Sequence, residues 1–164
     1  MNIIKTGLPP VIDSKTEILI AGSLPSDISL QKQEYYGNPG NDFWRILSTV
    51  LDVEMVGISY TLRIKNLLEH KIGLWDVYAS GLRKGSLDVD MQQPVMNRFD
   101  ILPERYPRLS SICLNGKEAG KAAEFFNKLG YNTTILLSSS GANRRNAEER
   151  LEQWQFALEL NSKS

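Results

Sequence analysis

The chain has very little cysteine and histidine, the side chains that most zinc and iron–sulfur sites use. Its 164 residues include one cysteine, Cys113, and one histidine, His70. A lone cysteine cannot form an internal disulfide, which favours a reducing, cytoplasmic setting. One histidine and one cysteine are also too few for a zinc or iron–sulfur site built from these ligand types, which argues against the zinc deaminases. We expect no metal and no cofactor.

The chain also lacks an excess of charge and long apolar runs. Its 19 basic and 19 acidic residues give a formal net charge of zero, so any contact with nucleic acid must come from a local basic patch. No apolar run approaches the length of a transmembrane helix, and residues 1–12 lack the apolar core of a signal peptide. We therefore expect a cytoplasmic protein without a membrane partner. With 41% hydrophobic residues, residues 1–164 suffice for one domain with a substantial core.

The most informative segment runs from residue 18 to residue 51. Residues 18–21 form a short apolar run ended by Gly22, which is typical of a parallel strand buried on both faces. After Asn41, apolar residues recur from Phe43 onward at the spacing of an amphipathic helix, with Asn41 as its expected N-cap. The connecting loop is rich in tyrosine, proline, glycine and amide side chains. Loops at the carboxyl ends of parallel strands are where such folds bind their ligands.

Helical and extended segments alternate along the rest of the chain. The patterns predict helices at residues 59–71, 99–106, 119–129 and 146–160, and strands at residues 74–77, 111–114 and 133–137. Four strands joined by helical crossovers indicate an α/β protein with a central four-stranded parallel sheet, covered by helices on both sides. We therefore predict a three-layer α/β/α fold.

This fold would gather four loops at one edge of the sheet, formed by residues 22–41, 78–88, 115–117 and 138–145. Aromatic rings there could stack on a flat polar ring, while an asparagine offers a donor and an acceptor to the edge of a heterocycle. His70 lies near the end of a predicted helix, which makes a Ser-His-Asp triad difficult to assemble. The groups present suit chemistry that needs only a positioned water and a stabilised leaving anion.

Four motifs occur at the predicted strand ends. They are G-S-L-P-S at 22–26, Y-Y-G-N-P-G-N-D-F-W at 35–44, W-D at 75–76 with K-G-S-L-D at 84–88, and N-G-K at 115–117 with S-S-S-G-A-N at 138–143. In this order they resemble the uracil-DNA glycosylase superfamily, most closely its deoxyinosine (hypoxanthine) branch, which is related to the mismatch-specific uracil/thymine-DNA glycosylases. The resemblance covers nearly the whole chain. It implies a uracil-DNA glycosylase-like fold and hydrolysis of the N-glycosidic bond of a deaminated base, without metal or cofactor.

The resemblance also implies roles for individual residues. Many superfamily members have a water-activating Asn or Asp where this chain has Leu24, whereas the catalytic asparagine of the deoxyinosine branch corresponds to Asn41. Tyr36 resembles the aromatic residue that stacks on the extruded base. Asn115 matches the asparagine that reads the base edge and polarises the leaving anion, which makes it the second catalytic residue. Further contacts with the substrate are implied for Gly22, Ser23, Leu24, Pro25, Phe43, Ser138 and Ser139.

Residues 138–143 resemble the loop that enters the DNA and holds the strand open. Leu137 and Gly141 stand where the branch often has prolines, which predicts a more mobile loop. Contacts with DNA are expected for Lys84, Ser140, Asn143, Arg144 and Arg145. Arg83 would join the basic residues in binding phosphates, which fixes register on the DNA but reads no sequence. We expect a monomer whose partner is DNA with deaminated bases, hypoxanthine first, with uracil and xanthine as alternatives.

Plainer roles exist for the same residues. Asn41 could be only a helix cap, Asn115 with the following glycine is a common turn pair, and adjacent arginines are often a solvated pair. Asn41 has no useful basic pKa, so a true general base, if one is required, would be Asp42 or Asp88. The sequence does not choose between these two.

Two other functions compete with the glycosylase. One is a binding module that recognises nucleic acid or a nucleotide through the same pocket without catalysis, an alternative that Leu24 keeps open. The other is a small-molecule hydrolase that uses Ser23, Ser26 or Ser138 as nucleophile. The lack of a well-placed histidine counts against the hydrolase.

Overall fold

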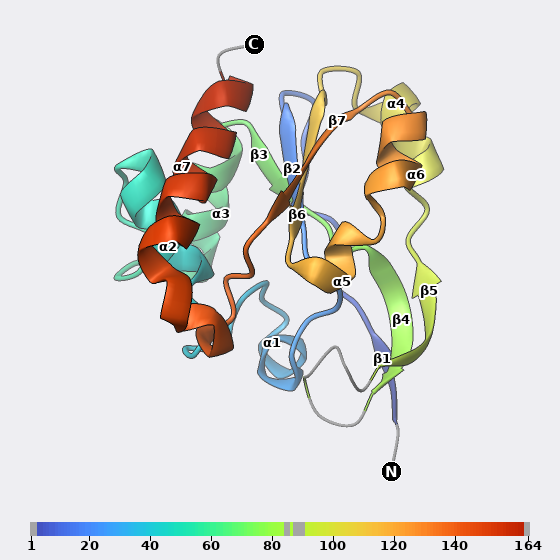
Figure 1. The fold of residues 1–164 in the computed structure, drawn as a ribbon, viewed down its shortest axis with the longest axis horizontal. Helices are drawn as coiled ribbons and strands as arrows, with labels where there is room; N and C mark the ends of the chain where they lie inside the picture. The colour runs from blue at the N-terminus through green and yellow to red at the C-terminus, as the bar shows by residue number, and fades with distance from the viewer. Residues whose placement is uncertain (1–2, 84–85, 87–90, 163–164) are drawn as a thin grey trace.

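The computed structural model describes residues 3–83, 86 and 91–162, which form two sheets (Figure 1). The first is a four-stranded parallel sheet with the strand order β3-β2-β6-β7. Its strands are β2 (Ile18–Ala21), β3 (Ile72–Leu74), β6 (Ser111–Asn115) and β7 (Asn132–Leu136). The predicted central parallel sheet is confirmed. The second sheet is antiparallel, with the order β1-β4-β5, and consists of β1 (Ile3–Thr6), β4 (Tyr78–Arg83) and β5 (Gln92–Met96).

The helices form layers on both faces of the parallel sheet. Figure 1 shows α2 (Phe43–Leu51), α3 (Tyr60–Glu69) and α7 (Ala147–Ser162) on one side. On the other side lie α4 (Leu102–Arg105) and α6 (Ala123–Lys128). The shorter helices are α1 (Asp27–Lys32), η2 (Phe99–Ile101), α5 (Lys117–Gly120) and η3 (Gly141–Asn146). None of the described helices is both long and apolar enough to cross a membrane.

Alternation along the central strands divides the core into two clusters. Ile18 and Ile20 pack with residues of α2, α3 and α7, whereas Leu19 and Ala21 pack with Phe126 and its neighbours on the opposite face. Successive side chains of a strand point to opposite faces of the sheet, so a strand that is apolar throughout can be buried on both. All four side chains of β2 are 1% exposed or less. The predicted three-layer α/β/α arrangement is therefore confirmed.

Three predicted elements differ most from those in the structure. The strand predicted at 74–77 begins at Ile72 and ends at Leu74, after which the chain leaves the sheet. The helix predicted at 119–129 is two short helices, α5 and α6. The segment predicted as one helix at 99–106 is a 3₁₀ turn followed by α4, whose second residue is Pro103.

The antiparallel sheet was not expected from the sequence, and it changes the role of Arg83. This arginine ends β4 and is fully buried, and its guanidinium donates a hydrogen bond to the carbonyl of Pro25. The predicted phosphate contact of Arg83 is therefore wrong. Its position on the second sheet lets it hold the loop that follows β2.

Gly73 allows the N-terminal segment to lie against β3. A Cβ atom at Gly73 would be 2.7 Å from the carbonyl oxygen of Val11, whose backbone pairs with Leu74. We expect Gly73→Ala to lower the free energy of unfolding by about 2 kcal/mol, because the backbone must shift to admit the methyl group. Urea denaturation measures this. Gly57→Ala is the control, since its Cβ would meet Glu54 only at ordinary contact distance, 3.8 Å or more. Equal losses in the two variants would contradict the prediction.

Candidate active site

A pocket of about 360 Å³ opens at the carboxyl ends of β2 and β6. In Figure 1 these strands run toward the part of the molecule where α1 and η3 lie. The pocket is lined by Gly22, Ser23, Leu24, Ser26, Ser29, Tyr36, Asn38, Asn41, Asp76, Ser86, Asn115, Ser138, Ser139 and Ser140. Each of the four loops predicted to meet at this edge contributes to the lining. Both predicted catalytic asparagines are present.

Tyr36 forms an aromatic wall of the pocket. Its backbone is left-handed, with φ of 54°, which is uncommon for a bulky residue. Its ring stacks on Phe43, with centroids 3.9 Å apart and planes 16° from parallel. Phe43 is fully buried and supports Tyr36 from behind, which corrects the prediction that Phe43 itself touches the substrate. Tyr36 lines the pocket, and an aromatic ring at a pocket wall is suited to stacking on a flat ligand.

Ser139 joins the two asparagines through hydrogen bonds. Its Oγ donates to Asn41 Oδ1 at 2.8 Å and accepts from Asn115 Nδ2 at 2.9 Å. Its backbone N–H donates to Asn115 Oδ1 at 3.0 Å, and Asn115 Nδ2 also donates to the Tyr36 hydroxyl at 3.1 Å. Ser139 is fully buried, so it serves first as a link between the asparagines. One connected network thus holds Tyr36, Asn41, Asn115 and Ser139 at the pocket wall.

Asn41 has a local role beside its place in the pocket. The N-cap residue of α2 is Asp42, so the predicted cap at Asn41 is wrong by one position. Asn41 Oδ1 nevertheless accepts a hydrogen bond from the Phe43 N–H at 2.9 Å, which satisfies a backbone donor at the start of the helix. The capping and pocket roles of Asn41 therefore coexist.

The loop after β2 approaches the rest of the pocket closely at Gly22. Its N–H donates to Asp76 Oδ1 at 3.0 Å, and a Cβ here would lie 3.0 Å from both Asp76 Oδ1 and the Tyr36 hydroxyl. Leu24 lines the pocket as predicted, together with the preceding serine. Pro25 is buried but is not among the lining residues, so its predicted contact with the substrate has no support here.

The carboxylate of Asp42 binds the guanidinium groups of Arg45, Arg144 and Arg150. Arg144 Nη2 and Arg150 Nη2 lie 2.9 Å and 2.7 Å from its oxygens. These hydrogen bonds, that of Arg144 foremost, hold the pKa of Asp42 well below its usual range. A carboxylate with so low a pKa is a weak base, and Asp42 does not line the pocket. The geometry therefore disfavours Asp42 as general base. The other candidate, Asp88, lies outside the described residues.

Arg150 is the important residue of the site that no sequence motif identified. It is 4% exposed, and its Nη1 donates to the carbonyls of Ser138 at 3.1 Å and Ser140 at 3.3 Å. The Asp42 N–H donates to the carbonyl of Ser139 at 2.8 Å, so the ion pair fixes the backbone on both sides of that serine. The signal for Arg150 was its spacing, because it lies four residues before a buried tryptophan on the inner face of α7.

The residues expected to contact DNA lie in different structural environments. Ser140 is the N-cap of η3, and Asn143 Nδ2 donates to a backbone carbonyl within the same loop at 3.0 Å. Arg144 is exposed but binds the Asp42 carboxylate, whereas Arg145 is exposed. Lys84 lies outside the described residues. Across the part of the chain that is described, no group of three His, Cys, Asp or Glu side chains is placed to hold a metal ion.

Replacing Asp42 with asparagine should show how much the buried ion pair contributes to the free energy of unfolding. Asp42→Asn leaves Arg150 buried without its counter-charge, so we expect a loss of about 3 kcal/mol in the free energy of unfolding at neutral pH. The lowered pKa of Asp42 means that its stabilisation is present above the pKa of an unfolded aspartate, about 3.9, and is lost as the pH falls through the folded-state pKa. The difference between variant and wild type should therefore shrink in acid.

Urea denaturation at neutral and acidic pH measures both effects. Asp100→Asn is the matched control, because Asp100 also bonds an arginine, Arg98, but at an exposed site, where ion pairs contribute little. A deficit for Asp42→Asn that is independent of pH, or no larger than that of the control, would contradict the assigned role of the pair.

Comparisons with known proteins agree with the motifs and the pocket. The family model of the uracil DNA glycosylase superfamily matches residues 9–160. A hypoxanthine DNA glycosylase of Methanosarcina barkeri is 47% identical over 154 residues, which are 94% of this chain and 98% of that protein. A second protein of that name, from Methanosarcina acetivorans, is 46% identical over 153 residues, covering 93% and 97% of the two chains.

A solved structure extends the agreement to three dimensions. It is the solution NMR structure of a candidate uracil DNA glycosylase from Methanosarcina acetivorans, which matches with a TM-score of 0.89 and 45% identity. The match covers 97% of this chain and 99% of that one. The resemblance predicted from the four motifs is thereby confirmed. The chain belongs to the uracil DNA glycosylase superfamily.

Proposed function

We propose that this protein removes a deaminated base, hypoxanthine first, from DNA by hydrolysing the N-glycosidic bond and leaving an abasic site. The observation that carries the proposal is the pair of asparagines, Asn41 and Asn115, joined at the wall of a pocket beside Tyr36. Two relatives that bear the name hypoxanthine DNA glycosylase and align over nearly the whole chain support the choice of base.

Extrusion of the base comes first, because the glycosidic bond cannot be reached inside a stacked duplex. A mispaired or damaged base requires less energy to extrude. Tyr36 then offers a preformed stacking surface, since Phe43 already fixes its ring. The pocket volume of about 360 Å³ lies at the small end of ligand sites, which span about 300 to 1,000 Å³. This size suits one extruded nucleoside.

Cleavage of the bond leaves positive charge on the sugar and negative charge on the departing base. An amide donor at the pocket wall favours the transition state, because it interacts more strongly with the base as the charge of the base grows. Asp76 is buried and brings a carboxylate to the lining, where its charge would offset the positive charge of the sugar. Water is the nucleophile, and the chain's own contribution is position and electrostatics.

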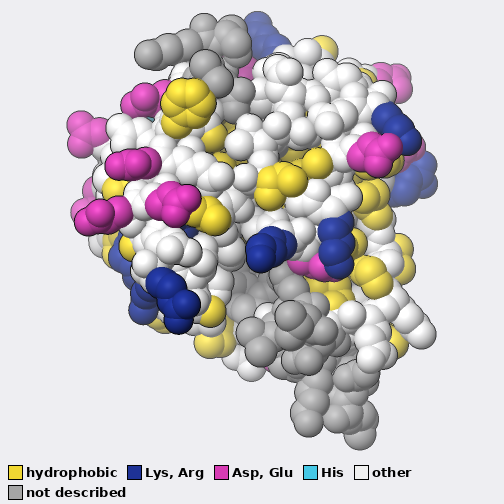
Figure 2. Space-filling view, in the orientation of Figure 1, with side chains coloured by type: hydrophobic (Ala, Val, Ile, Leu, Met, Phe, Trp, Pro, Cys, Tyr) yellow, Lys and Arg dark blue, Asp and Glu magenta, His cyan; other side chains and the backbone are white. Residues whose placement is uncertain are grey.

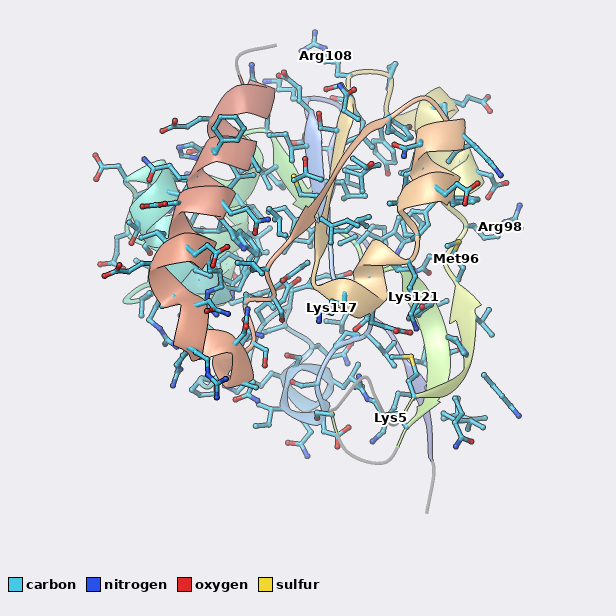
Figure 3. The ribbon with its side chains drawn as sticks, in the orientation of Figure 1. Lys5, Met96, Arg98, Arg108, Lys117 and Lys121 are labelled. Carbon is cyan, nitrogen blue, oxygen red and sulfur yellow. The ribbon has the colours of Figure 1, made fainter. Side chains whose placement is uncertain are left out.

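Exposed cations near the pocket are candidates for contacts with DNA phosphates. Figure 2 shows acidic side chains gathered over α7, whereas basic side chains lie lower on the same face, over η3 and α5. Lys117 is exposed and follows Asn115 by two residues, and Arg145 is exposed on η3. Figure 3 shows Lys117 near the carboxyl end of β6 and Arg108 far away at the opposite end of the sheet. Charge at the pocket end of the sheet would hold the DNA.

Asn41→Ala tests the reaction. Because it removes an oriented amide from the pocket wall, we expect excision of hypoxanthine to fall by about 10²-fold or more, while binding to the same DNA is retained. The assay uses labelled oligonucleotides that contain hypoxanthine, uracil, xanthine or only normal bases, with alkali to cleave abasic products. Asn127→Ala on α6, away from the pocket, is the control. Wild-type protein that binds these strands but excises nothing would instead favour the non-catalytic binding module.

Removing a single cation should change the salt dependence of binding. For Lys117→Gln or Arg145→Gln, we expect the slope of log Kd against log salt concentration to fall by about one. Arg108→Gln provides the control, because this exposed arginine lies at the far end of the sheet. Fluorescence anisotropy with a labelled duplex gives the slopes. Identical slopes for all three variants and the wild type would rule out phosphate contacts at α5 and η3.

A further inference from the structure

We propose that Asn41 acts on the substrate as a hydrogen-bond donor, with its amide nitrogen directed to the departing base, and that Ser139 is the positioning residue that fixes this orientation. The inference rests on the proposed glycosylase function and deepens it. It states which atom of the Asn41 amide faces the substrate. This orientation decides whether Asn41 stabilises the leaving base or activates the water.

Backbone donors determine which way each amide faces. The Phe43 N–H lies 2.9 Å from the side-chain oxygen of Asn41, and the Ser139 N–H lies 3.0 Å from that of Asn115. A backbone N–H can only donate, so the atom that it meets must be an oxygen. Turning either amide by 180° would place two donors against each other. The oxygens of both side chains are therefore held by the protein backbone.

The hydroxyl proton of Ser139 completes the assignment for Asn41. Asn115 Nδ2 donates to Ser139 Oγ at 2.9 Å, so the single proton of Oγ is directed to Asn41 Oδ1 at 2.8 Å. Asn41 Oδ1 then accepts two hydrogen bonds, from Ser139 and from the Phe43 N–H. An amide oxygen has two lone pairs, and both are occupied. Asn41 keeps no acceptor with which to orient a nucleophilic water.

The amide nitrogens of the two asparagines differ in the hydrogen bonds that they make. Both Nδ2 hydrogens of Asn115 are used, one with the Tyr36 hydroxyl and one with Ser139 Oγ. No residue in the described part of the chain accepts a hydrogen bond from Asn41 Nδ2. Asn41 is half-buried and lines the pocket. Its amide N–H groups are therefore donors still available to a substrate at the pocket wall.

The reaction requires such a donor. Water adds its oxygen to the C1′ atom, the bond from C1′ to the base nitrogen breaks with its electron pair on the base, and the proton released by the water neutralises the base anion. Ring nitrogens and the carbonyl oxygen of hypoxanthine gain negative charge as this bond breaks. A donor already oriented toward them stabilises the transition state more than the ground state.

Ser139 can impose this orientation because its own position is fixed. Its side chain is fully buried, and its carbonyl accepts from the Asp42 N–H. Arg150 bonds the carbonyls of the residues on either side of Ser139. A polar group supported from behind in this way holds its partner in one geometry.

The variant Asn41→Asp tests whether the side chain at position 41 acts on the substrate as a hydrogen-bond donor or as an acceptor. An aspartate still accepts from the Phe43 N–H and from Ser139, so the variant should fold, but it places an oxygen where the amide nitrogen stood. We expect single-turnover excision of hypoxanthine to fall by about 10²-fold at neutral pH and to recover in acid, when the carboxyl group gains a proton that it can donate. Wild type measured over the same pH range corrects for the intrinsic pH dependence of the reaction.

The same pH profile distinguishes a failure of this inference from a failure of the proposed glycosylase function. If the wild type excises the base but the relative rate of Asn41→Asp stays flat or rises with pH, Asn41 does not act as a donor and the inference is overturned, while the glycosylase function stands. If the wild type binds the DNA and excises no base, the proposed function and this inference fail together.

Ser139→Ala tests the positioning role. Without the hydroxyl, Asn41 loses one of the two contacts that fix its oxygen, so we expect kcat to fall about tenfold, the effect of one oriented hydrogen bond. KM for the oligonucleotide should not change, because Ser139 is buried beneath the asparagines. Ser111→Ala, another buried serine at the opposite end of β6, controls for the loss of a buried hydroxyl. A raised KM with unchanged kcat would show that Ser139 contacts the substrate directly, against the proposal.

Discussion

The buried ion pair between Asp42 and Arg150 holds together the segments that form the active site. Asp42 directly follows Asn41 at the start of α2, and Arg150 belongs to α7 at the other end of the chain. Both Nη atoms of the arginine bond the carboxylate or the carbonyls around Ser139. The position of Ser139, and through it of both asparagines, depends on this pair.

Buried residues therefore hold the side chains that line the pocket in place. The ion pair fixes the loop at residues 138–140 and thereby the position of Ser139. The hydrogen bonds of Ser139 then orient Asn41 and Asn115 differently. Asn115 uses its amide hydrogens within the protein and holds Tyr36 by its hydroxyl. Asn41 keeps its amide nitrogen for the pocket. Such a site can favour the reaction because preorganised dipoles need not reorient while the bond breaks.

Much of the fold follows from local sequence, and much of the site does not. The apolar run at 18–21 and the helix after Asn41 were predictable, because burial on one or two faces leaves a periodic pattern in the chain. The motifs identified both asparagines and Tyr36. Arg150 was not predictable as the partner of Asp42, because the two residues lie 108 positions apart and no local pattern records such a contact. The antiparallel sheet, which buries Arg83, depends on similarly distant pairing.

The central claim is that the protein presents the Asn41 amide nitrogen, held by Ser139, to the base that leaves. It is tested most directly by a crystal structure of the complex with DNA that contains 2′-fluorinated deoxyinosine, whose glycosidic bond resists cleavage. The account predicts the base stacked on Tyr36, with Asn41 Nδ2 at hydrogen-bond distance from a nitrogen or oxygen of the base and Asn41 Oδ1 still bound to Ser139. An Asn41 side chain turned so that its oxygen holds a water near the sugar would contradict it.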